Sequence, residues 1–402
     1  MKKIFQYTAA VAMTMLASCS QDESLDVRPA QGITFNTAVG QATRANVMDL
    51  DGLKTAGFKV SAFRYSGTGA DKKVSDKVHF DNLSVGWTGS AWANDVRYWP
   101  SSNEKTVVGG NSYETTGLDF IAYSPTALND GASVTYAFGD MTISDFAPAA
   151  ACANQKDLSV AYAADQTEAA SGVSGVSLTF KHSLAQVEVK ARNYASDLKI
   201  DIKSVKLCNV VGKASMKLGV TSPTPTWTMG ETTAADIAAH KYATADLTGT
   251  TLVNTATEAT SFHTNGDYFM LLPQTSPIWQ NASQTADNAS GAYFLVTCKI
   301  YDQEAGNTHY RFGVGTASTW GAVAIPLVAN GGAGKMKWEA GKKYTYTLEF
   351  FKDGGGAGYT PPTDGTPTGD EGKSVTPGKV TFSTSISVDN WGEGGSYTWP
   401  EE

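Results

Sequence analysis

Two short stretches near opposite ends of the chain follow the same alternating pattern. Residues 33–39 read Ile-Thr-Phe-Asn-Thr-Ala-Val, with Ile33, Phe35 and Val39 on one side of a period-two repeat. Such alternation indicates a half-buried β-strand. Residues 380–386 read Val-Thr-Phe-Ser-Thr-Ser-Ile and repeat the pattern in phase. Two strands with the same alternating pattern are suited to occupying the same kind of groove in a sheet. The alternative is that they are simply the first and last strands of one sheet.

The composition predicts an all-β protein. The chain has 402 residues, enough for two or three cores of ordinary domain size. It contains 40 glycines and only 17% charged residues, a balance typical of many short strands and turns. The formal net charge of −8 argues against nucleic acid as a partner and against electrostatic docking on an anionic membrane.

The first residues are typical of a bacterial export signal. Lys2 and Lys3 precede an apolar run that ends at Leu16, too short for a permanent membrane span. The run ends in Leu-Ala-Ser-Cys, which resembles the lipobox of bacterial lipoproteins. We therefore expect residues 1–18 to be removed and Cys19 to carry acyl chains that anchor the protein in the outer membrane. The alternative is an ordinary secretory signal with a chance cysteine.

Changes in pattern along the chain predict its division. A restart of strand alternation at Val176 places a domain boundary there, to within about ten residues. The stretch 353–378 is rich in Gly and Pro and has no apolar periodicity, which predicts a flexible linker. Its ends would lie about 28 Å apart in a random coil and at most about 86 Å apart in an extended chain. Cys208 and Cys298 are expected to be two buried free thiols, and the alternative is that they pair in a disulfide. The expected parts are a propeptide with the first strand (19–44), two domains (45–175 and 176–352), the linker (353–378) and a C-terminal arm (379–402).

A search for a reactive centre finds no convincing motif. The five histidines are too far apart in sequence to form a helical zinc pair, and no Gly-x-Ser-x-Gly elbow is present. We expect no enzyme activity, no metal and no other cofactor. Trp87, Trp92 and Trp99 are the best candidates for a glycan platform, because aromatic faces stack on sugars. The competing and favoured interpretation is that these tryptophans belong to the core.

Several motifs follow one another along the chain. They are Tyr98-Trp-Pro100, residues 118–125, 157–161, 178–187, 268–274 and 338–346, and Ile386 to Trp391. In this order they resemble the fimbrillin-like proteins, the lipoprotein-derived subunits of type V pili. This resemblance implies two β-sandwich-like (transthyretin-like) domains and cleavage by an arginine-specific protease between Arg44 and Ala45.

The resemblance further implies that cleavage removes the strand with Ile33, Phe35 and Val39, and that a strand of the next subunit fills the groove. The matching donor positions here are Val380, Phe382, Ile386 and Val388.

The partners expected from this resemblance are other pilus subunits, the arginine-specific protease and, before cleavage, the lipid of the outer membrane. The expected function is a structural subunit of a surface fimbria that contributes to adhesion and biofilm formation. The alternative is a surface lipoprotein that does not polymerise, keeps residues 19–44 and binds glycans or host ligands.

Overall fold

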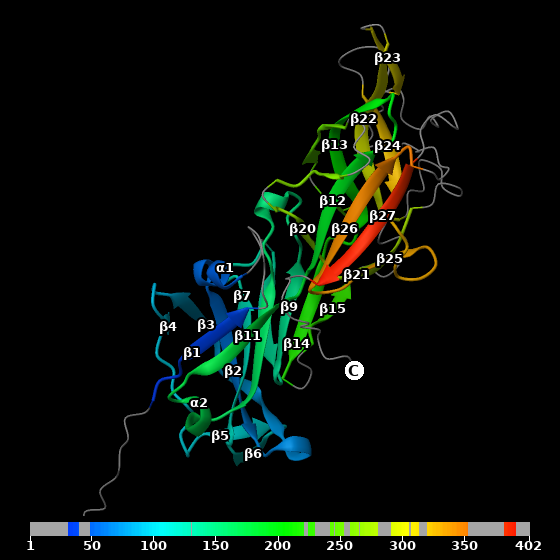
Figure 1. Ribbon diagram of the computed structural model, residues 1–402. Helices are drawn as coiled ribbons and strands as arrows, with labels where there is room; N and C mark the ends of the chain where they lie inside the picture. Colours follow the sequence, from blue (N-terminus) through cyan, green and yellow to red (C-terminus); the bar gives the residue numbers. More distant parts are fainter. Residues whose placement is uncertain are drawn as a thin grey trace, which may run out of the picture.

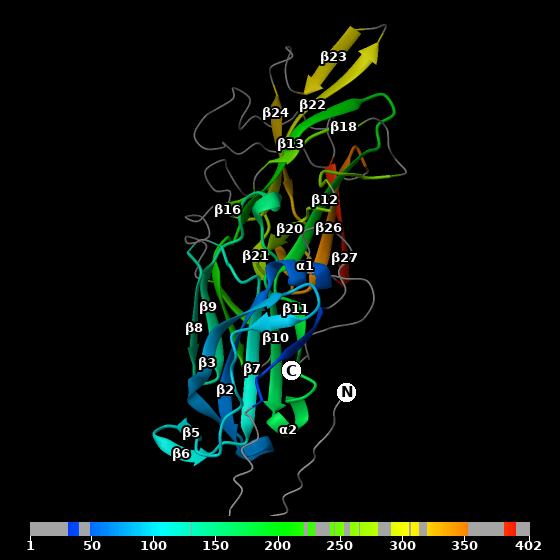
Figure 2. The same cartoon turned by 90° about the vertical axis from the view of Figure 1, so that its left-hand side faces the viewer.

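The computed structural model describes residues 31–39, 49–129, 131–220, 224–229, 242–244, 246–252, 258–264, 266–279, 291–304, 307–312, 320–352 and 382–390. Nearly every element in these ranges is a strand, which confirms the all-β prediction (Figures 1 and 2). Within these ranges, helix is confined to four short connections. These are α1 (Leu50–Ala56), η1 (Gly69–Asp71), η2 (Cys152–Asn154) and α2 (Glu168–Ser171).

A seven-stranded sheet forms the centre of the N-terminal half. Its middle strand β7 is buried at every position, because it has a neighbouring strand on each side and side chains packed over both faces. The expected first strand lies at one edge of this sheet. The strand order is β1 (Phe35–Val39), β11 (Val176–His182), β10 (Ser159–Gln166), β7 (Gly117–Ser124), β2 (Phe58–Ser66), β3 (Lys73–Trp87) and β4 (Trp92–Asn94).

A four-stranded sheet shares a core with the first sheet. Phe63 and Ile121 of the first sheet belong to one buried cluster with Met141 and Leu218 of the second. The first sheet carries a separate buried cluster that includes Phe35, Phe58 and Phe120. We call these two sheets the first unit. The order of the second sheet is β15 (Thr226–Met229), β14 (Ala214–Gly219), β9 (Asp140–Phe146) and β8 (Ser133–Ala137).

Two further sheets enclose the third core and make up the second unit. Val189, Phe294 and Tyr346 lie in this core and come from both sheets, as expected of a β-sandwich. One sheet has the order β19 (Thr260–Ser261), β12 (Ala185–Asn193), β26 (Lys342–Phe350), β27 (Phe382–Asn390), with β20 (Phe269–Leu271) also on β12. The other has the order β16 (Tyr242–Ala243), β13 (Lys199–Val210), β22 (Tyr293–Glu304), β23 (Asn307–Phe312), with β17 (Leu247–Thr248) and β18 (Thr251–Leu252) on β13 and β24 (Gly321–Pro326) on β22.

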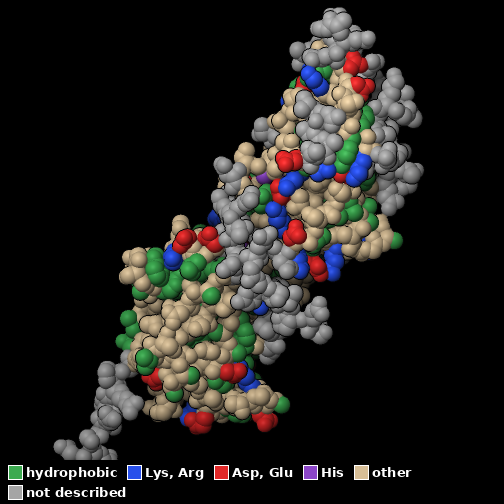
Figure 3. Space-filling view, viewed as in Figure 1, with side chains coloured by type: hydrophobic (Ala, Val, Ile, Leu, Met, Phe, Trp, Pro, Cys, Tyr) green, Lys and Arg blue, Asp and Glu red, His purple; other side chains and the backbone are tan. Residues whose placement is uncertain are grey.

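Two small ribbons complete the described strands. They are β5 (Lys105–Val108) with β6 (Asn111–Glu114), and β21 (Gln274–Pro277) with β25 (Lys335–Trp338). The two units lie end to end in an elongated molecule (Figures 1 and 2). On the face shown in Figure 3, acidic and basic side chains are mixed over the second unit, whereas the first unit shows mainly uncharged surface. In the parts of the chain that the structure describes, no helix has the length and apolarity needed to cross a membrane.

The strand pairing crosses the boundary expected near residue 175. That boundary separates β10 from β11, yet the two strands are hydrogen-bonded neighbours, with Ser159 opposite His182. The pairing therefore places the division after His182. The chain also returns to the first unit further on, because β14 pairs with β9 over Ala214–Gly219. A restart of alternation marks a new strand and does not by itself mark a new domain.

Candidate functional site

The first strand is a separable edge element of the first unit. β1 pairs in parallel with β11 over five positions, from Phe35 opposite Val176 to Val39 opposite Phe180. Ile33 and Phe35 are 2% and 4% exposed, and Val39 is half-buried. The Phe35 ring lies edge-on to Phe58 and Phe120, with centroid distances of 6.0 and 5.9 Å. The three residues predicted for the groove strand thus face the core of this unit.

The residues on each side of β1 form the groove in which this strand lies, and we call this groove the seat of β1. The Ile33 amide donates a hydrogen bond to the Arg97 carbonyl oxygen at 2.7 Å, and the Val176 amide donates to the Thr34 oxygen at 2.8 Å. The side-chain amide of Asn36 donates to the Ser174 carbonyl oxygen. Withdrawal of this strand would therefore leave a slot with unpaired backbone groups along β11 and an apolar floor. The predicted cleavage position, Arg44 and Ala45, and the lipidation position, Cys19, lie outside the described residues.

The predicted donor strand lies on its own second unit in the single chain. β27 pairs antiparallel with β26 at nine positions, from Phe382 opposite Phe350 to Asn390 opposite Lys342, and forms the edge of its sheet (Figure 1). Ile386 is half-buried against the core, whereas Val388 is 47% exposed. Val380 lies outside the described residues. The strand is thus held mainly through its backbone, and its side chains from 384 to 389 are at most half-buried.

The three tryptophans pack as core and wall residues of the first unit. Trp99 is 7% exposed, and its ring lies 6.0 Å from that of Phe120. Trp92 contacts Phe58 at 5.0 Å and Trp87 at 5.3 Å between ring centroids. Trp99 is therefore a core residue, whereas Trp87 and Trp92 are each partly exposed.

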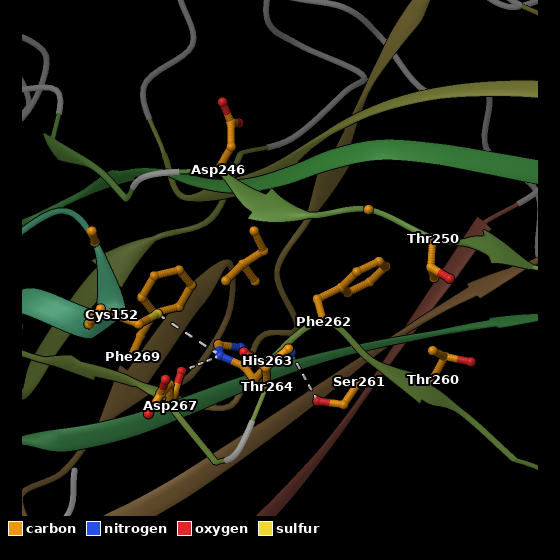
Figure 4. Close-up of a pocket in the computed structure, with 14 residues that line it drawn as sticks. Cys152, Asp246, Thr250, Thr260, Ser261, Phe262, His263, Thr264, Asp267 and Phe269 are labelled. Carbon is orange, nitrogen blue, oxygen red and sulfur yellow. Dashed lines mark hydrogen bonds between the residues drawn. The ribbon is translucent and has the colours of Figure 1, made fainter. Parts of the chain in front are cut away.

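A cleft where the two units meet was not found by sequence reasoning. Its volume is about 380 Å³, and Figure 4 shows Cys152 of η2 opposite His263, which follows β19. The His263 ring nitrogen Nδ1 lies 2.7 Å from the Asp267 carbonyl oxygen and 4.0 Å from the Cys152 sulfur. These residues are 111 positions apart in sequence, so no local motif signals the cleft.

The electrostatics of this cleft argue against a thiol nucleophile. Burial raises the pKa of Cys152 to about 12, so the thiol stays protonated near neutral pH. Burial also lowers the pKa of His263, so the imidazole stays neutral and its Nδ1 proton is donated to Asp267. Cys208 and Cys298 are buried thiols that are not joined in a disulfide, as expected from the sequence. Among the described residues, no group of three or more His, Cys, Asp or Glu side chains is arranged to hold a metal ion.

Comparison with known proteins gives a family match over most of the chain. Residues 43–361 match the family described as fimbrillin-like. Among curated proteins, none matches the chain. The family is one of fimbrial subunits, so the match supports a structural role in a fimbria at the cell surface.

The solved structures that are similar to this chain have low sequence identity to it. A putative cell adhesion protein from Parabacteroides distasonis has 12% identity and a TM-score of 0.42, with 90% of this chain and 98% of that chain covered. One from Bacteroides uniformis has 14% identity and a TM-score of 0.40, with the same coverage of 90% and 98%. The fimbrial anchor protein Mfa2 from Porphyromonas gingivalis has 10% identity and a TM-score of 0.31, with 89% and 97% covered.

Proposed function

The chain belongs to the fimbrillin-like family, and from this premise we propose that it is a structural subunit of a type V pilus. It is exported as a lipoprotein anchored in the outer membrane through Cys19. An arginine-specific protease cleaves it after Arg44, and it then polymerises by strand exchange. Its place is the cell surface and the fimbria, where polymers contribute to adhesion and biofilm formation.

The observation that carries this proposal is the seat of β1. The segment that contains β1 adds Ile33 and Phe35 to the core of the first unit, and among the described strands β1 forms a ladder only with β11, while Gly32 just before it adds a single bridge to Tyr98. Its continuation toward the rest of the chain runs through residues 40–48, which include Arg44. One cut there turns β1 from a covalent part of the sheet into a bound peptide. Added strands and natural edge strands are held by the same backbone hydrogen bonds.

The position of β27 supports its assignment as the donor. As an edge strand, β27 forms a backbone ladder with β26 and with no other described strand, so its departure would break one ladder only. Full burial of the four predicted donor side chains, Val380, Phe382, Ile386 and Val388, in the groove of a neighbour would contribute at most about 6–12 kcal/mol before ordering costs. In its present place Val388 is 47% exposed, so transfer to an apolar groove gains burial. A retained donor strand favours a shaft subunit over a terminal tip.

The cleavage step is tested by incubation of the purified chain with an arginine-specific protease. We expect a ladder of stable oligomers on a denaturing gel run without boiling. The Arg44→Ala variant should remain monomeric, whereas the matched Arg97→Ala variant, which changes another exposed arginine, should polymerise. Equal polymerisation of the Arg44→Ala protein would exclude cleavage at this position as the trigger.

The donor step is tested with two single charges on β27. Ile386→Asp would place an unpaired charge in an apolar groove, an unfavourable transfer. The neighbouring Ser385→Asp charge lies on the exposed side of the same strand. After cleavage, the Ile386→Asp protein should fail to extend chains and the Ser385→Asp protein should extend them. Equal chain lengths for both would mean that the donor lies elsewhere.

A further inference from the structure

A lysine and two carboxylates meet at one end of the first sheet, apart from the elements assigned to assembly. Lys72 directly precedes β3, Asp119 lies on the buried strand β7, and Asp165 lies on β10. The Lys72 ammonium nitrogen is 2.8 Å from Oδ1 of Asp119 and 2.7 Å from Oδ1 of Asp165. One nitrogen therefore contacts two carboxylates on two neighbouring strands.

The site is largely closed to water on the side of Asp119. The Asp119 side chain is fully buried, and only 17% of the Lys72 side chain is exposed. The Tyr65 ring lies under the Lys72 ammonium group at 4.4 Å and is itself buried. Asp165 is 61% exposed and connects the group to solvent. A buried carboxylate and an amine in contact, with a solvent-linked acid beside them, meet the requirements of a condensation reaction.

The two oxygens of Asp119 have different surroundings. Oδ1 accepts a hydrogen bond from the backbone amide of Asp165 at 2.8 Å, in addition to the contact with Lys72. Oδ2 is buried and has no hydrogen-bond partner in the described structure. An ionised carboxylate with one unpaired buried oxygen is unfavourable. The bonded oxygen is placed to be a polarised carbonyl, and the unpaired one is placed to leave.

A backbone irregularity supplies the bond to Oδ1. The pairing of β10 with β7 shifts register between Ala163 and Gln166, and Asp165 has a left-handed φ of 56°. This bulge aims both the amide and the carboxylate of Asp165 at the Lys72–Asp119 pair. Bulges and left-handed residues of this kind are frequent next to reactive groups.

We propose that Lys72 and Asp119 condense to an intramolecular isopeptide bond, with Asp165 as the proton acceptor. The Lys72 ammonium group gives a proton to the Asp165 carboxylate, which passes it to Oδ2 of Asp119, and the neutral amine then attacks the carboxyl carbon of the protonated Asp119. The backbone amide of Asp165 stabilises the charge that develops on Oδ1. The C–Oδ2 bond then breaks, and Oδ2 leaves as water with two of the protons that began on Nζ. The ammonium and the carboxylate are thereby replaced by one neutral amide and one water molecule.

The electrostatics favour the protonated form of Asp119 that this attack needs. Burial raises the pKa of the Asp119 carboxyl, although the hydrogen bonds from Lys72 and Asp165 act in the opposite direction. A protonated carboxyl loses Oδ2 as water more readily than a carboxylate does. The bond would tie the β2–β3 connection to the central strand β7 and would hold the sheet together under a pulling force along a fimbria.

Peptide mapping of the full chain tests the bond directly. Because trypsin does not cut after an amidated lysine, residues 65–73 and 106–156 should appear as one branched peptide. Its mass should be lower than the sum of the two peptides by one water molecule. Recovery of both peptides unlinked, with cleavage after Lys72, would overturn the proposal and leave an ordinary buried ion pair.

Three variants locate the chemistry. Lys72→Arg keeps the charge but should give only unlinked peptides. Asp165→Asn keeps the backbone amide and should lose most of the linked product. Asp119→Asn replaces the leaving oxygen with nitrogen, so a linked peptide should lose one ammonia molecule instead of water. A linked peptide that persists in the Lys72→Arg protein would contradict the assignment of the amine, and full linkage in Asp165→Asn would contradict the role of Asp165.

Discussion

Replacement of Phe35 by alanine should destabilise the uncleaved chain and leave the cleaved, β1-free protein unchanged. Phe35 is 4% exposed and packs edge-on against Phe58 and Phe120, so truncation leaves a cavity in the core of the first unit. Burial losses of this kind cost about 3–5 kcal/mol. Burial of the Ile33 and Phe35 side chains together contributes about 3–6 kcal/mol to the binding of the first strand in its groove. The Phe35→Ala change therefore removes about half or more of this free energy.

The assay is chemical denaturation of the first unit before cleavage and after cleavage with removal of the N-terminal peptide. The midpoint for Phe35→Ala should fall only before cleavage, while Ala38→Ser, an exposed change on the same strand, should leave both midpoints in place. A loss of about 3 kcal/mol also corresponds to a roughly 100-fold lower affinity of the first unit for the cleaved N-terminal peptide. Equal destabilisation of both forms, or of neither, would refute the reasoning.

Three further outcomes follow from the packing and the charges. The Glu188 carboxylate lies 2.8 Å from the Lys343 ammonium; burial acts to raise the pKa of Glu188, but Lys343 and Lys190 hold it below its usual range. The stability that ionised Glu188 contributes is fully present above the ordinary glutamate pKa and is lost as the pH falls through the lower pKa of Glu188 in the folded protein. The Glu188→Gln variant should therefore have a lower unfolding midpoint than the unchanged protein at neutral pH, and this difference should vanish in acid. With the leader cysteine replaced, no thiol should react rapidly with Ellman's reagent at mildly alkaline pH before denaturant is added, because burial raises the pKa of Cys152 to about 12. A fragment of residues 31–175 lacks β11 and β14 and should not show the circular dichroism of a folded sheet.

The sequence predicted the fold class and the terminal strands because alternation is a local signal. β1 and β27 were both visible as period-two patterns, and the burial of Ile33 and Phe35 follows the predicted side. β3 was largely missed, because polar residues such as Asp81 interrupt its alternation and Asn82 takes a left-handed φ of 48°. Bulged strands lose the periodicity by which they are recognised.

The arrangement of the units and the reactive cluster depended on long-range contacts. The boundary near residue 175 could be predicted only approximately, because a strand pattern does not show which sheet receives the strand, and β14 returns to β9 across about 70 residues. Lys72, Asp119 and Asp165 are each unremarkable in their own segments. Only the pairing of β7 with β10 and the bulge at Asp165 bring them together.

A reversible lock on β1 tests the central claim most directly. Ala38 and Thr179 face each other across β1 and β11, and both are exposed, so cysteines at these positions are placed for a disulfide. After cleavage by an arginine-specific protease, the oxidised Ala38→Cys/Thr179→Cys protein should stay monomeric, and a reducing agent should start polymerisation. Polymerisation of the oxidised protein at the rate of the reduced one would show that β1 need not leave its seat, and would contradict the account.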